Sequence, residues 1–344
     1  MSGKLRKFLK TNGVSPVRRL IEEWRYAREQ RDRLSHLADL NKVRQLANLK
    51  SLRGLTMTDD DILLQLKDGR QFSWDILQPS SLLSLPEDGN FEPQETELVR
   101  RIVSENDVVI DIGANFGYYT TLMAGLVGPG GSVHSFEPVP SAYKLLTKNV
   151  QMNRYPQVVH TNNAALGERP GKLTLRYPKR FGTVLSSSSD LHNDLLTECE
   201  AEMTTLDHYI QSRKIRKVSF IKCDVEGFEL FVLRGFKLMA FLDLPIWLLE
   251  TQSATSKGLG YEPKEVFVHM DKFGYQFYYT DGTGLHRLKD FENLPPVYNF
   301  FCLNPSVHKH VLTKISGIVS QVDFCPPAQI SAKEKEKSGS RNFS

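Results

Sequence analysis

The residues best suited to chemistry lie in segment 108–119, which reads VVIDIGANFGYY. Its order is an apolar run, a glycine-rich turn and the start of a helix, which is typical of a nucleotide-binding turn. Gly113 lets the turn close tightly, and Gly117 lets the backbone approach a ligand beside the N–H groups of the helix. The spacing is GxNxG and not the GxGxxG of dinucleotide enzymes, so the turn alone does not specify a pyrophosphate.

Two carboxylates flank this turn. Asp111 lies near the end of the first predicted strand, where it would repel a pyrophosphate but would suit a ligand with an ammonium and a sulfonium, such as S-adenosylmethionine. Glu137 ends the next predicted strand, and an acid there accepts hydrogen bonds from both ribose hydroxyls. Because NAD sites use such an acid as well, Glu137 predicts an adenosine-containing ligand without deciding which one.

A third group of acids follows the fourth predicted strand. Asp224 and Glu226 lie in segment 224–227, and Glu250 ends the strand after it. Ligands of open α/β sheets bind at the carboxyl ends of the strands, so we expect these acids to share one edge with Asp111 and Glu137. Two other interpretations stay open: Asp224 and Glu226 could cap the following helix, and Glu250 could be a base or a metal ligand.

The elements that must position these residues follow an alternating pattern from residue 107 onward. Apolar runs at 108–112, 132–137, 158–161, 218–224 and 246–250 alternate with helical segments at 118–127, 141–152, 206–213, 226–238 and 263–273. This pattern predicts an α/β fold with a parallel sheet buried on both faces, which strands at 276–280 and 299–303 complete. Ahead of it we expect a hairpin over 61–75, turning at Asp68-Gly69, and a short helix over 93–104.

The charge of the chain is unevenly distributed. Its 344 residues carry a formal charge of +4, but residues 1–54 hold 14 Lys and Arg against 5 Asp and Glu. We expect a basic helical extension there, either solvated or docked on a negatively charged membrane or glycolipid surface. Residues 331–344 are rich in Lys, Glu, Ser and Gly and are expected to be disordered. The middle of the chain is therefore acidic.

Several classes of protein are excluded or disfavoured. The four cysteines are widely spaced, which argues against a disulfide framework or a zinc ribbon. The chain has no apolar run of the ~18–20 residues that a membrane span needs, and we do not expect a secretory signal because no apolar region follows the basic residues of the N-terminus. We expect a cytoplasmic protein, with peripheral membrane contact through the basic extension as the alternative. A small-molecule or glycan partner is expected, nucleic acid is not, and a homo-oligomer stays open.

These segments together resemble the FkbM family of S-adenosylmethionine-dependent methyltransferases. The resemblance is carried, in order, by 109–117 (VIDIGANFG), 136–138 (FEP), 163–166 (NAAL), 204–207 (TTLD), 221–229 (IKCDVEGFE) and 233–235 (LRG). It implies a class I methyltransferase, Rossmann-like fold with a seven-stranded sheet, one strand of which is antiparallel. The implied domain spans 55–330, with a lead-in at 55–106 and a cofactor-binding core at 107–305.

The resemblance also implies roles for individual residues. The methionine end of the cofactor would be held by Asp111, Gly113, Asn115 and Gly117. Glu137 would hold the ribose, Asn163 would line the adenine, and Asp224 with Glu226 would flank the transferred methyl group.

The expected reaction is O-methylation of a hydroxyl on a sugar, glycan or secondary metabolite. Our first candidate for the general base is Asp224, with Glu226 orienting it or acting in its place. A divalent metal bridging Asp224 and Glu250 is an alternative activator, although no dedicated metal motif supports it. The competing functions are a nicotinamide-dependent oxidoreductase and a non-catalytic adenosine-ligand-binding protein of the same fold. We expect the long segment 178–200 to be a lid or disordered.

Overall fold

The computed structural model describes residues 52–57, 62–74, 92–178, 196–238, 244–281 and 284–316. The basic extension up to residue 51, the tail at 331–344 and most of segment 178–200 lie outside the described residues. The expectations for those segments therefore stay predictions.

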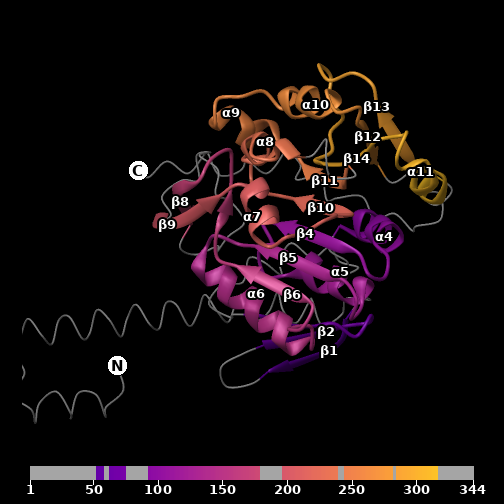
Figure 1. The fold of residues 1–344 in the computed structure, drawn as a ribbon. Coiled ribbons are helices and arrows are strands. Elements are labelled where there is room, and N and C mark those ends of the chain that lie inside the picture. Colours follow the sequence, from indigo (N-terminus) through magenta and orange to yellow (C-terminus); the bar gives the residue numbers. More distant parts are fainter. Residues whose placement is uncertain are drawn as a thin grey trace, which may run out of the picture.

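An eight-stranded sheet forms the centre of the molecule, in the order β13-β12-β14-β11-β10-β4-β5-β6 (Figure 1). Its strands are β4 Val108–Ile112, β5 Ser132–Phe136, β6 Val159–Asn162, β10 Phe220–Cys223, β11 Ile246–Glu250, β12 Gln276–Thr280, β13 Leu285–Leu288 and β14 Asn299–Leu303. Neighbours from β11 through β6 are parallel, whereas β14 runs antiparallel to both β11 and β12. The expected seven strands are present, and β13 adds an eighth at the edge, antiparallel to β12, which the sequence did not predict.

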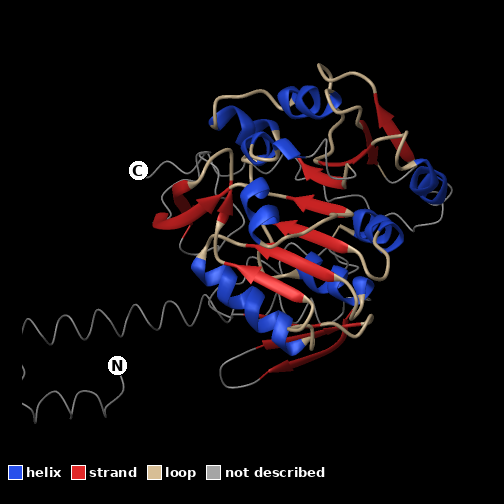
Figure 2. Ribbon diagram, viewed as in Figure 1, coloured by secondary structure: helices blue, strands red, loops and turns tan. Residues whose placement is uncertain are grey.

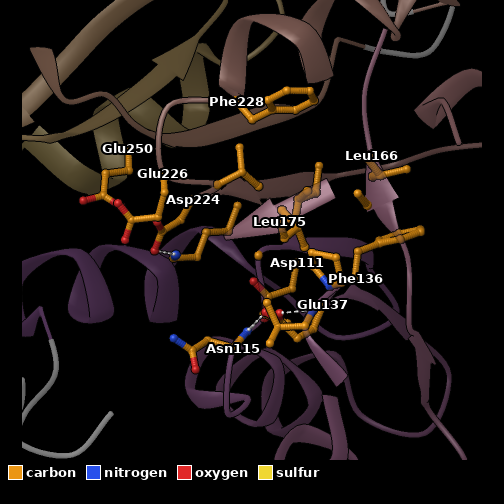
Figure 3. A pocket seen from close by; sticks show the side chains of 18 of the residues that line it. Asp111, Asn115, Phe136, Glu137, Leu166, Leu175, Asp224, Glu226, Phe228 and Glu250 are labelled. Atoms are coloured by element: carbon orange, nitrogen blue, oxygen red, sulfur yellow. Dashed lines mark hydrogen bonds and ion pairs between the residues drawn. The ribbon is translucent and has the colours of Figure 1, made fainter. Parts of the chain in front are cut away.

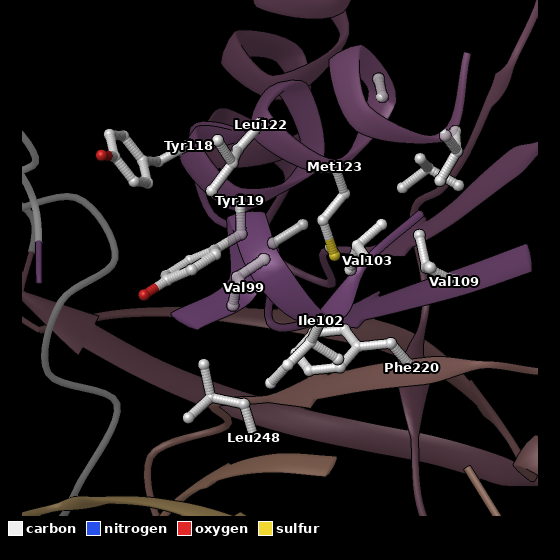
Figure 4. Close-up of a cluster of buried hydrophobic side chains, with 14 of the residues drawn as sticks. Val99, Ile102, Val103, Val109, Tyr118, Tyr119, Leu122, Met123, Phe220 and Leu248 are labelled. Carbon is white, nitrogen blue, oxygen red and sulfur yellow. The ribbon is translucent and has the colours of Figure 1, made fainter. Parts of the chain in front are cut away.

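Helices cover both faces of this sheet (Figure 2). They are α4 Pro93–Ile102, α5 Tyr118–Val127, α6 Pro140–Met152, α7 Leu206–Ser212, α8 Glu229–Arg234, α9 Ser253–Gly258, α10 Lys264–Asp271 and α11 Lys309–Ser316. Because successive side chains of a strand point to opposite faces, each strand contributes to two cores. Val109 and Phe220 pack under α4 and α5 (Figure 4), while their neighbours Ile110 and Ile221 pack in the second core with residues of α7, α8 and α10. None of the described helices is long and apolar enough to span a bilayer.

The helix expected over 226–238 is shorter than predicted. It begins at Glu229 because Glu226 and Gly227 have φ values of 53° and 96°, which no right-handed helix can contain. The interpretation of Asp224 and Glu226 as helix caps is wrong as well, since the N-cap residue is Phe228 and the helix has no side-chain cap.

The lead-in forms a three-stranded antiparallel sheet of β1 Leu52–Met57, β2 Ile62–Leu66 and β3 Gln71–Trp74. This confirms the hairpin, and it also places the domain boundary expected after residue 54 inside a strand. Arg70 joins the hairpin to α5: its Nη1 donates to the carbonyl of Tyr118 at 2.8 Å, and its guanidinium lies 4.4 Å from the Tyr118 ring centroid.

A second small sheet was not predicted. It consists of β7 Ala165–Leu166, β8 Gly171–Pro178 and β9 Leu196–Thr204, in the order β7-β9-β8. The arrowheads of the central strands point toward it (Figure 2), so it lies beside the carboxyl edge of the main sheet. That edge is where the sequence places the site.

Candidate active site

A cavity of about 680 Å³ opens at the carboxyl edge of the main sheet. Its lining comes from the turn after β4, the ends of β5, β10 and β11, and the small sheet (Figure 3). The volume lies within the range of ordinary small-molecule sites. All but one of the eight predicted site residues either line this cavity or shape the turn beneath it.

Asp111 contributes an unpaired acceptor to the cavity. The residue is 1% exposed, and its Oδ2 accepts a hydrogen bond from the Thr120 hydroxyl at 2.6 Å. Its Oδ1 is buried without a hydrogen-bond partner. Burial raises the pKa of Asp111, while the nearby Lys222 ammonium acts in the opposite direction. Because an unsatisfied buried acceptor costs about 1–3 kcal/mol, Asp111 favours a ligand that donates to it.

The glycine-rich turn packs directly on the end of β10. Gly113 has φ 79°, and a Cβ atom added there would lie 1.8 Å from the carbonyl oxygen of Asp224. Gly117, with φ 92°, is the N-cap residue of α5. Only glycine fits at position 113, and its lack of a side chain lets the turn pack against the Asp224 backbone.

Glu137 ties the turn to the end of β5. Its carboxylate accepts the backbone N–H of Asn115 at 2.8 Å and that of Val139 at 2.9 Å. Burial raises the pKa of Glu137 to about 7 in spite of these bonds. A carboxylate has about four lone-pair sites, so both oxygens can still accept from a ligand hydroxyl.

Asn163 lies elsewhere than the resemblance implies. It is exposed and does not line the cavity; its Nδ2 donates to the carbonyls of Glu137 at 2.8 Å and Pro138 at 3.1 Å. Its neighbours from Ala164 to Leu166 line the cavity instead. Asn163 therefore fixes the loop that presents them.

One side of the cavity is apolar and has the character of a slot for a planar base. Phe136, Leu166 and Phe228 line it together with Leu175 of β8, which the sequence analysis missed (Figure 3). The signal was present, since Leu173 and Leu175 alternate with polar residues over 171–178, as in a half-buried strand.

The opposite side is rich in carboxyl groups. Lys222, which the sequence analysis also missed, pairs in register with Asp111 of β4 and is 4% exposed. Its Nζ lies 2.7 Å from Asp224 Oδ2 and 4.8 Å from the centroid of the Tyr119 ring. A lysine inside an otherwise apolar run was the available signal.

The pKa values of Asp224 and Glu250 are shifted in opposite directions. Burial disfavours the Asp224 carboxylate, but the Lys222 ammonium and the hydrogen-bonded Glu250 side chain together act against it, and the pKa of Asp224 is lowered. Burial and the Asp224 charge together raise the pKa of Glu250 well above its usual range. The two side chains are hydrogen-bonded to each other, so they act as a pair in which Asp224 is ionised and Glu250 holds the proton.

Glu226 is the group best suited to exchange a proton. Burial, reinforced by the charge of Asp224, raises its pKa to about 8, and its Oε2 is buried without a hydrogen-bond partner. The left-handed backbone conformation of Glu226 is held by Glu229. The Oε1 atom of Glu229 accepts hydrogen bonds from the N–H groups of Val225 and Gly227, each at 3.1 Å. Glu229 therefore shapes the loop, while Glu226 lines the cavity.

The part of the chain that the structure describes contains no group of three or more His, Cys, Asp or Glu side chains placed to hold a metal ion. The carboxyls for which a bridging metal was considered, Asp224 and Glu250, contact each other. A metal bridging these two carboxyls therefore stays an untested alternative.

Comparison with known proteins finds similarity to methyltransferases over the residues that form this site. Residues 111–277 match the family model described as the methyltransferase FkbM domain. Methyltransferase 1 of Beauveria bassiana is 24% identical over 148 residues, which cover 38% of this chain and 59% of that protein. The hexuronic acid methyltransferase AglP of Haloferax volcanii is 26% identical over 202 residues, covering 57% and 75%. The 31-O-demethyl-FK506 methyltransferase FkbM of Streptomyces tacrolimicus is 29% identical over 154 residues, covering 38% and 59%.

Among solved structures, an O-methyltransferase from Bacillus cereus is 12% identical, with a TM-score of 0.37, over 65% of this chain and 85% of that one. The assignment of the fold rests on the strand order of the chain itself.

Proposed function

We propose that this chain, whose residues 111–277 match the methyltransferase FkbM domain, transfers a methyl group from S-adenosylmethionine to a hydroxyl of a sugar, glycan or secondary metabolite. The relatives support this acceptor class by their names, one as a hexuronic acid methyltransferase and one as the methyltransferase of an O-demethyl compound. The match covers only part of these proteins, so the acceptor is a proposal for this chain.

The observation that carries the proposal is the unpaired Oδ1 of Asp111 in a cavity dominated by acids. Six carboxyl side chains line the described cavity against two cationic ones. The six are Glu92, Asp111, Glu137, Asp224, Glu226 and Glu250, and the two are Lys222 and Arg176. A pyrophosphate would meet carboxyl groups on most sides, whereas the ammonium and sulfonium of S-adenosylmethionine would meet hydrogen-bond acceptors and favour the ionised form of these carboxyls.

The residues present fit this cofactor in three places. Asp111 would accept from its ammonium, Glu137 from its ribose hydroxyls, and the slot at Phe136 and Leu166 would hold its adenine. When bound, the cofactor supplies an electrophilic methyl group. The work of the protein is then mainly alignment, which can contribute about 7–11 kcal/mol of a barrier.

Glu226 is our candidate for the base that takes the proton of the acceptor hydroxyl. An effective base needs a pKa near the working pH and a free oxygen within reach. Glu226 meets the pKa requirement and its Oε2 has no hydrogen-bond partner, whereas Asp224 is ion-paired with Lys222 and its pKa is lowered. This reverses the order of the two candidates given by the sequence alone and makes Asp224 the residue that holds the acid cluster in place.

Binding calorimetry on the full chain tests the proposal. We expect S-adenosylmethionine and its demethylated product to bind and NAD not to bind. Asp111→Asn should weaken S-adenosylmethionine binding by about 10- to 100-fold, the value of a hydrogen bond to a charged group. The matched control is Asp271→Asn, on the exposed end of α10. Binding of NAD, or full affinity in Asp111→Asn, would refute the proposal.

A further inference from the structure

The cavity has two ends of different chemistry (Figure 3). Phe136, Leu166 and Leu175 line one end. The other end, which we call the carboxyl end, consists of Glu92, Lys222, Asp224, Glu226, Glu250 and Gln252. Since the adenosine part of the cofactor fits the apolar end, the acceptor has to approach its methyl group from the carboxyl end.

The hydrogen-bond donors that the structure describes at the carboxyl end already serve its acids. Lys222 Nζ donates to Asp224 at 2.7 Å, and Gln252 Nε2 donates to Glu250 at 2.6 Å. Glu92, in turn, accepts from the Tyr119 hydroxyl at 2.7 Å and from Asn299 Nδ2 at 2.9 Å. The carboxyl end therefore holds one ammonium against four carboxyl groups, and the Oε2 atom of Glu226 has no hydrogen-bond partner in the structure.

The rim of the cavity adds an exposed aromatic ring. Tyr298 and Leu259 both line the cavity, and they are 57% and 43% exposed. An exposed ring beside hydrogen-bond acceptors suits a molecule with an apolar face and a hydroxylated edge, which is the shape of a pyranose sugar.

We propose that the acceptor is an uncharged or amine-bearing sugar and that the carboxyl end rejects sugar acids. This inference rests on the proposed function. The hydroxyls or ammonium of such a sugar would donate to the carboxyl oxygens of this end. A uronate would instead place a negative charge beside four carboxyl groups and a single ammonium that is already paired with Asp224, and the repulsion is largest at a pH where Glu226 is ionised. The selectivity would therefore differ from the hexuronic acid specificity that the name of the relative AglP states.

Arg176 is the described lining residue on which an acidic acceptor could depend. It lies on β8, its side chain is 69% exposed, and its Nε is 2.7 Å from Glu198 Oε1. Arg176 belongs to the small sheet and not to the carboxyl end. If a uronate bound at Arg176, its affinity would therefore fall in the variant Arg176→Gln.

Calorimetry at pH 8.5, where Glu226 is mostly ionised, on the full chain saturated with S-adenosylhomocysteine measures this selectivity. The probes are the methyl glycosides of glucose, glucosamine and glucuronic acid, which share one ring and differ in charge. We expect the glucuronide to bind at least about tenfold more weakly than the other two. Glu226→Gln should reduce this difference in affinity by about three- to tenfold, because it removes one of the carboxyl groups that repel the glucuronide. The control Glu262→Gln, exposed and outside the cavity, should preserve it.

Three results would overturn the inference. The glucuronide could bind as well as the neutral sugar, its binding could depend on Arg176, or no sugar could bind although S-adenosylhomocysteine does. If S-adenosylhomocysteine itself fails to bind, the proposed function fails, and this outcome is distinct from the other three.

Discussion

Glu226 and Asp224 lie two residues apart in one loop, yet their environments push their pKa values in opposite directions. Asp224 keeps its charge because Lys222 is 2.7 Å away, whereas burial raises the pKa of Glu226 to about 8. Such a separation commonly divides the work between two acids at an active site. The sequence identified both residues, but it could not rank them, since the ranking depends on Lys222 and Glu250 from two neighbouring strands.

This division of work predicts the pH dependence of catalysis. Glu226 acts as a base only after it loses its proton, so kcat/KM should rise with pH and level off above about 8. Glu226→Gln should lower kcat by about 10²- to 10⁴-fold and abolish this rise. Asp224→Asn should slow turnover but keep the rise. Initial rates of S-adenosylhomocysteine release from pH 6 to 10 measure both effects. If Asp224→Asn abolished the rise with pH and Glu226→Gln kept it, Asp224 would be the base.

At the scale of elements, the sequence predicted best where apolar runs are continuous. The bounds of β4, β11, β12, β14 and α5 agree with the expectation because each is a mostly apolar segment with at most two polar residues. β9 was missed because its exposed face carries Glu198, Glu200 and Glu202, so the strand has little apolar character. The beginning of α8 was misplaced because the positive φ of Glu226 is imposed by contacts of Glu229, which a helical pattern does not reveal.

The same limit applies to the site. That three strands end in acids at one sheet edge follows from the parallel arrangement, and Asp111, Glu137 and Asp224 do meet there. The contributions of Glu92 and Leu175 arise from α4 and β8 folding back onto that edge. They required the tertiary structure.

Two glycines allow the cost of backbone strain to be distinguished from the cost of lost packing. Gly113 and Gly69 both have positive φ, 79° and 91°, but an added Cβ at Gly69 would meet nothing within 4 Å. Gly69→Ala should therefore destabilise the fold by only about 1 kcal/mol, the cost of the strain. Gly113→Ala should cost about 3–5 kcal/mol, because its Cβ would also push the turn away from Asp224. Urea unfolding of both variants measures this difference, and equal losses would show that the contact with β10 is unimportant.

The middle of the chain is acidic, and several of its acids are buried with raised pKa values. Burial raises the pKa of Glu95, Glu137 and Glu229 to about 7 and that of Glu226 to about 8, from an ordinary value of 4.5. The folded state then binds more protons than the unfolded state between pH 4.5 and 8, so these acids make stability fall as pH rises. The fold accepts this cost at the edge where a cationic ligand is proposed to bind.

Buried histidines oppose this trend, but only in acid. Burial lowers the pKa of His134 and His308 to about 4, so they make stability rise with pH up to about 6.5. Above that pH the four acids dominate, and the free energy of unfolding should decline by about 4 kcal/mol between pH 6.5 and 8.5. Glu226→Gln should flatten the decline, and saturating S-adenosylmethionine should raise the melting temperature more at pH 8.5 than at pH 6.5, because its positive charge favours the ionised carboxyls. Differential scanning fluorimetry across this range tests both effects. A melting temperature that rises with pH in the ligand-free protein would show that the buried acids are compensated by other groups.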